Sequence, residues 1–193
     1  MKHYTSLALT AAMITGLLLG TTACADNNRQ DTKEVAEELN DHKFDDNNRE
    51  NDAQFLVNAA EMSREEISLG ELALKKGRTK HVRSLGAMMV TEHTAALAAV
   101  TALAKSKNVS LPTAQTDSGR DAFRKLTDIK AKSFDKEYAD MMVNGHKSAI
   151  TLFEKASNDS KDAEINAWAT SSLPSLRTHL EHSLECQKLC EKM

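Results

Sequence analysis

Apolar side chains recur every three or four residues along four long stretches of this chain, at about residues 52–76, 79–107, 134–156 and from 161 to the C-terminus. That spacing places the apolar side chains of each stretch on one face of an α-helix. The clearest stripe lies in the third stretch and comprises Phe134, Tyr138, Met142, Ala149, Phe153 and Ala156. The pattern therefore predicts four long amphipathic helices.

Capping and helix-breaking residues indicate where these helices end. Asp52 is suited to cap the first long helix, and Gly77 follows its last turn. Residues 108–118 are polar and contain a proline, so they predict a loop, and a short helix is expected over 119–130. Pro174 should kink the last helix or split it, because proline removes a helix hydrogen bond.

The composition agrees with an all-helical chain. Among 193 residues there are only 7 glycines and 2 prolines, while helix-forming residues are abundant. Four long helices with one apolar face each can bury a core without disulfides. The expected fold is an all-α four-helix bundle over residues 52–193, with a short extra helix before the third long helix.

Each of the four apolar stripes is interrupted by one polar side chain. These interruptions are Glu66, His93, His146 and His179, and each falls where the helical spacing calls for an apolar residue. Three imidazoles and a carboxylate fit a tetrahedral zinc site and would also suit copper or iron. The centre of a helix bundle is where such sites are built.

Two other interpretations of these four residues stay open at this point. Each histidine could instead make one ordinary hydrogen bond, for instance to Glu66, Glu92, Asp135 or Tyr138. A small error in helical phase would also leave Glu66 at the border of the core, beside solvent. The depth of each side chain along its helix does not follow from the sequence.

Di-iron chemistry of the ferritin type is disfavoured. Such sites use a Glu-x-x-His motif on each of two helices. Here the residues three positions before His93, His146 and His179 are Val90, Val143 and Leu176, so the motif is missing at all three. Zinc or copper is therefore the better match, and iron the poorer one.

A secondary metal candidate lies on the last helix. His182, Cys186 and Cys190 follow His179 in steps of three and four residues, which aligns them along one face. Thiols and imidazoles one turn apart can chelate a soft ion such as Cu(I) or Zn(II). The alternatives are a frayed helix end, or an intermolecular disulfide in an oxidising compartment.

The N-terminus predicts export to the bacterial cell envelope. Residues 1–23 combine a charged start, a short apolar run and small residues, as a signal peptide does, and the last of them resemble a lipoprotein cleavage site before Cys24. By that resemblance Cys24 would carry the lipid anchor, and the following Ala25 favours the outer membrane. The hydrophilic segment 24–51 is expected to be a flexible tether.

Several stretches resemble the DUF4142 family of exported bacterial proteins. They are FLVNAAEMSREEISLGELALKKG, VRSLGAMMVTEHTAAL, LPTAQ, FDKEYADMMVNGHKSAITLFEKA and WATSSLPSLRTHLEH, which together span roughly residues 52–182. The resemblance implies a ferritin-like four-helix bundle, and members are often labelled as outer membrane proteins. Glu66, His93, His146 and His179 sit at the motif positions, whereas Cys186 and Cys190 lie beyond them. The family name implies no activity.

Three hypotheses about function follow. The leading one is metal binding at the bundle centre, for storage, buffering or stress protection. The rival is a non-catalytic structural or interaction module with a buried His–Glu network, and the third is an enzyme with a mononuclear metal. A net charge of −3 and 4% aromatic residues argue against a nucleic-acid partner, which leaves the membrane, through the lipid anchor, as the expected partner.

Overall fold

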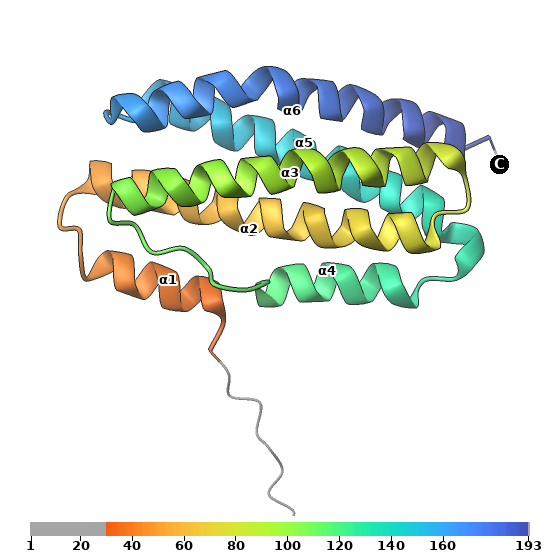
Figure 1. Ribbon diagram of the computed structural model, residues 1–193, viewed down its shortest axis with the longest axis horizontal. Helices are drawn as coiled ribbons and strands as arrows, with labels where there is room; N and C mark the ends of the chain where they lie inside the picture. The colour runs from red at the N-terminus through yellow and green to blue at the C-terminus, as the bar shows by residue number, and fades with distance from the viewer. Residues whose placement is uncertain (1–29, 193) are drawn as a thin grey trace, which may run out of the picture.

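The computed structural model describes residues 30–192, and these residues form six helices (Figure 1). No strand occurs among them, so the predicted all-α class is confirmed. The predicted signal peptide and Cys24 lie outside the described residues. The helices are α1 (Thr32–Asp41), α2 (Asn47–Lys76), α3 (Lys80–Ser106), α4 (Asp117–Asp128), α5 (Ala131–Asp159) and α6 (Ala163–Cys190).

The four long helices lie side by side along the length of the molecule (Figure 1). Contacts between helices are densest between α2 and α3 and between α5 and α6, which follow one another directly in the chain. The two pairs meet mainly through α2 and α5, and α3 contacts α6 less extensively. The short helices α1 and α4 lie along the outer side of α2 (Figure 1).

The α2–α3 pair is close because glycines face each other across it. A Cβ atom added at Gly70 would lie 2.8 Å from the carbonyl oxygen of Gly86, and one added at Gly86 would lie 2.8 Å from that of Gly70. The turn between the two helices is held from α5, where both carboxylate oxygens of Asp135 accept a backbone N–H, from Arg78 and Thr79, at 2.8 Å each. Both carboxylate oxygens of Asp135 are therefore occupied by this turn, and Asp135 does not pair with a histidine.

The expectation of a flexible tether over residues 24–51 is wrong for the part that the structure describes. Asp31 caps α1, and Ala36 and Phe44 bury their side chains. Asn40 is also buried, and its amide both donates to and accepts from the backbone of Ser110. The larger apolar side chains of α1, Val35 and Leu39, remain exposed, so the segment is held by these few buried groups rather than by a full apolar face.

Two helix boundaries also differ from the prediction. The first long helix begins at Asn47 rather than near Asp52, because Asp46 already accepts a hydrogen bond from the backbone of Arg49 and caps it. The last helix runs without a break from Ala163 to Cys190, although Pro174 lies inside it. A split at Pro174 is therefore wrong. Buried Leu173 and Leu176 on either side anchor the helix to the core, which offsets the missing hydrogen bond.

We expect Gly86→Ala to destabilise the protein by about 1–3 kcal/mol, because its methyl group would overlap the α2 backbone. Thermal unfolding followed by circular dichroism measures this loss. The matched control is Gly119→Ala, where the nearest atoms belong to the flexible side chain of Gln115. A Gly86→Ala protein as stable as the wild type would contradict the tight α2–α3 contact.

Candidate metal centre

The apolar core consists of two clusters, one towards each end of the long helices. The first cluster includes Phe55, Val100, Phe153 and Ile165, and the second includes Leu69, Met89, Tyr138, Met142 and Cys186. On each long helix the predicted polar residue falls between the two clusters: Glu66 on α2, His93 on α3, His146 on α5 and His179 on α6. The four side chains therefore share one depth, the property that the sequence left open.

Three of these four side chains converge. One ring nitrogen from each of His93, His146 and His179 lies within 4.8 Å of the other two. The Nε2 atoms of His93 and His146 are 3.4 Å apart, and the ring centroids are separated by 5.3–5.5 Å. The three residues expose only 5%, 1% and 5% of their surface, so the cluster is buried. Among residues 30–192 it is the one group of this kind whose donor atoms are assembled.

The hydrogen bond at the other side of the His146 ring orients its lone pair. Its Nδ1 lies 2.8 Å from the carbonyl oxygen of Met142, one turn earlier in α5. A carbonyl only accepts, so Nδ1 carries the proton and donates. Nε2 is then unprotonated and directs its lone pair towards His93 and His179. A backbone carbonyl behind the ring is the usual support for a metal-binding histidine.

Burial keeps the three histidines neutral. It lowers the pKa of His93 to about 3 and that of His146 to about 4, and the neighbouring histidines add to the shift of His93. Burial also lowers the pKa of His179, whose Nδ1 is buried without a hydrogen-bond partner. Neutral imidazoles are the form that binds metal ions.

Glu66 is buried but does not join the three nitrogens. Its Oε1 is 3.8 Å from Nδ1 of His146, the nitrogen already bonded to Met142 and turned away from the cluster. Glu66 is 7% exposed, so its placement at a solvent border is wrong. Burial raises its pKa well above the usual value, and its Oε2 lacks a partner.

Two further residues lie around Glu66: Gly145, which the sequence analysis missed, and Tyr138, which it named only as a core residue and a possible hydrogen-bond partner of a histidine. A Cβ atom at Gly145 would lie 2.8 Å from Oε1 of Glu66, so only glycine leaves room for this carboxyl group. The hydroxyl of Tyr138 is buried without a partner, and burial, together with nearby Glu66, raises its pKa well above the usual value. The sequence signal for Gly145 was its position, one residue before the inward-facing His146.

A pocket of about 260 Å³ opens beside the cluster. Its walls come from α2, α3, α5 and α6, and both His93 and His179 line it. Most of the other lining side chains are small: Ser63, Ala59, Ala95, Ala96, Ala99, Ser171, Ser172 and Ser175. A small molecule could therefore approach the histidine nitrogens from this side.

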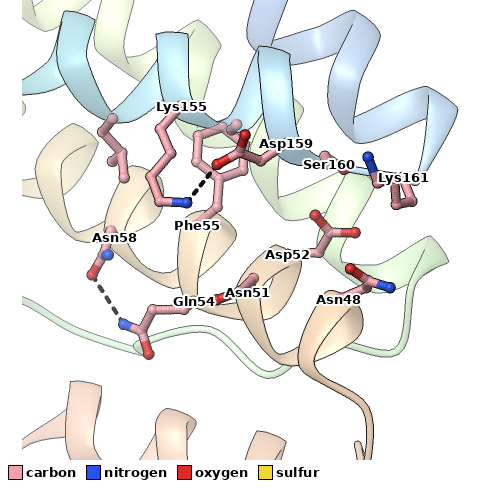
Figure 2. Close-up of a pocket in the computed structure, with 12 residues that line it drawn as sticks. Asn48, Asn51, Asp52, Gln54, Phe55, Asn58, Lys155, Asp159, Ser160 and Lys161 are labelled. Atoms are coloured by element: carbon pink, nitrogen blue, oxygen red, sulfur yellow. Dashed lines mark hydrogen bonds and ion pairs between the residues drawn. The ribbon is translucent and has the colours of Figure 1, made fainter.

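A larger pocket, of about 480 Å³, lies elsewhere, between the beginning of α2 and the end of α5 (Figure 2). Two pairs of its polar side chains bond to each other. Lys155 pairs with Asp159 at 2.7 Å, and Gln54 donates to Asn58 at 3.2 Å, as the dashed lines in Figure 2 show. The first apolar cluster separates it from the histidines, so its size does not make it the chemical site.

The secondary candidate is only partly assembled. Helix α6 continues to Cys190, so a frayed end is wrong, and Cys186 and Cys190 are both buried free thiols. His182 is exposed. Burial raises the pKa of Cys186 to about 12. His182, Cys186 and Cys190 do not gather their donor atoms as the histidine cluster does.

Comparison with protein families gives a match over residues 24–185, to a model described as a domain of unknown function, DUF4142. The chain belongs to the DUF4142 family. This confirms the resemblance drawn from the motifs. Neither the curated proteins nor the solved structures that were compared contain a match. The function of this chain is therefore inferred from the geometry of its site.

We expect the metal-free protein to lose stability on acidification below about pH 6.5. The folded pKa values of the three histidines are lowered, so the unfolded chain binds more protons as the pH falls. Within this site Glu66, with a raised pKa, opposes this loss of stability above about pH 4.5, but it is one group against three histidines.

Replacing His93 by glutamine tests whether its lowered pKa destabilises the folded protein on acidification. The dependence of unfolding free energy on pH should weaken by up to about 1.4 kcal/mol per pH unit between about pH 4 and 6. Urea unfolding at several pH values, after treatment with a chelator, gives this slope. The control is His42→Gln, since His42 is exposed at the end of α1. Equal slopes for wild type and His93→Gln would show that His93 titrates normally.

Proposed function

We propose that this protein binds one transition-metal ion at the centre of a ferritin-like four-helix bundle, through His93, His146 and His179. The observation that carries the proposal is the convergence of three neutral, buried imidazoles from three helices. Storage, buffering or protection against metal stress are the roles that such a site suits. Glu66 lies behind His146 and is not among the proposed ligands.

The donor set favours a mononuclear site. Three imidazoles with an open fourth position suit zinc and copper, whereas a di-iron centre needs carboxylates that bridge two ions. Within the described residues no carboxylate oxygen belongs to the cluster. The unpartnered Nδ1 of His179 is a further sign of fit, because an unpaired buried nitrogen costs about 1–3 kcal/mol unless something binds it.

A second candidate function is a mononuclear metal enzyme, and the pocket beside His93 and His179 favours it. A bound ion would supply a Lewis acid at an open position facing this pocket. Azide added to the Co(II)-substituted protein tests the open position. A change in the visible spectrum supports it, and an unchanged spectrum leaves storage or buffering.

The rival hypothesis, a purely structural His–Glu network, has weaker support. Such a network is stable only when its members satisfy each other. Here Glu66, Tyr138 and His179 each keep a buried polar atom without a partner. Glu92 is exposed, and Asp135 bonds to the α2–α3 turn.

The metal content of the protein, purified without a polyhistidine tag, tests the proposal. We expect close to one zinc or copper ion per chain, and a loss of affinity of at least about 100-fold in His146→Ala, because even supporting residues contribute about 10–100-fold. His146→Gln, which keeps more of the side-chain volume, should lose the ion as well. Mass spectrometry of the metal and a competition titration measure both quantities.

Two further variants give this experiment its controls. His42→Ala removes an exposed histidine and should keep the full metal content. Glu66→Gln should also keep it, since Glu66 lies on the opposite side of His146. A protein that takes up no zinc, copper or iron would refute the proposal and leave the structural network.

We further propose that Cys24 is lipidated and anchors the domain to the outer membrane of the bacterial envelope. Because α1 begins at Thr32, the anchor and the folded domain are separated by at most about 30 Å of extended chain. The domain would then lie close to the membrane surface rather than at the end of a long tether.

Lipidation is tested by growing cells with a labelled fatty acid. The wild-type protein should carry the label and sediment with membranes, whereas Cys24→Ala should lose the label and appear in the soluble fraction. Cys190→Ala, which removes a buried thiol, is the control. Labelling that persists in Cys24→Ala would refute the anchor.

A further inference from the structure

A second pocket between α3 and α6 gathers side chains that bind soft metal ions. Its volume is about 230 Å³, and it lies beside the second apolar cluster. The central histidine cluster separates it from the 260 Å³ pocket that His93 and His179 line. Five of its eight lining residues carry a potential ligand: His81 and Met88 from α3, and His182, Glu185 and Cys186 from α6.

The sulfur atoms give this pocket its selectivity. Cys186, a free cysteine that is 3% exposed, lines the pocket, and so does Met88, whose side chain packs against the second apolar cluster. Thiol and thioether ligands select Cu(I), whereas magnesium and calcium prefer oxygen. This donor set therefore differs from the three imidazoles of the central site.

The remaining donors are free to adjust. His81 and His182 are exposed, so their rings can change rotamer on the picosecond to nanosecond scale. The donor atoms are not gathered in the structure, and an ion would have to draw the two imidazoles towards the buried sulfur. Cys190 does not line the pocket, which leaves it out of the ligand set.

We infer that this pocket is a separate site for one Cu(I) ion, bound by the sulfur atoms of Cys186 and Met88 and an imidazole of His182. On binding, the Cys186 thiol gives its proton to water and forms the copper–sulfur bond, without any change of oxidation state. His81 lies at the pocket as an additional donor. The site does not depend on the central histidine cluster being a metal site.

Anaerobic titration with Cu(I) against a chromophoric Cu(I) chelator tests this assignment. Cys186→Ser should weaken binding at the pocket by at least about 100-fold, since it replaces a direct ligand. Met88→Leu and His182→Ala should each weaken it by about tenfold or more. His182 is exposed and Met88→Leu conserves volume, so these variants should stay folded, which circular dichroism checks.

The central site and the pocket are told apart in the same titration. A Cu(I) equivalent that survives in His146→Ala and disappears in Cys186→Ser supports the pocket, whether or not the central site binds copper. An equivalent lost in His146→Ala and unchanged in the three pocket variants overturns the pocket and leaves the central site intact. Wild-type protein that binds no Cu(I) overturns the pocket site.

Discussion

A layer of buried imidazoles divides the apolar core of this protein, and the rest of the structure accommodates it. Water is nearly excluded from His93, His146 and His179, so each ring must be neutral and each ring nitrogen needs a partner. The Met142 carbonyl accepts from Nδ1 of His146, and Nε2 of His146 faces Nε2 of His93 at 3.4 Å. Nδ1 of His179 is left buried without a partner. Apolar side chains at these positions would leave no buried polar atom unpaired, so the imidazole layer lowers the stability that the core could otherwise have.

The surroundings of His146 show how one ring of this layer is held. Its proton is directed to the Met142 carbonyl, and its lone pair is directed to the other two rings. Gly145 makes room for the Glu66 carboxyl group on the protonated side. At 3.8 Å from Nδ1 the carboxyl group is beyond hydrogen-bond distance, so the Met142 carbonyl orients the ring and Glu66 occupies no ligand position.

Helical periodicity could predict which side chains point inward, because a stripe depends only on spacing along one helix. It therefore identified His93, His146 and His179 together with the four long helices. It could not predict that Glu66 would face the far side of His146, since that depends on the rotation of α2 relative to α5. The same holds for α1, because the few side chains that it buries gain partners only when the rest of the domain is in place. The predicted split at Pro174 was wrong for a related reason, since buried leucines on both sides of the proline hold α6 together.

Both small pockets are lined by α3 and α6, two long helices that contact each other only over a limited area. The α2–α3 pair is tight, as Gly70 and Gly86 show, and α5 packs densely against α6. Between α3 and α6 the facing residues near His93 and His179 are mostly alanine and serine, which are too small to close the gap. Beyond the histidine layer, the gap is lined by sulfur and imidazole instead. The two tight pairs thus fix the helices, and the less extensive contact between them leaves a pocket that reaches His93 and His179.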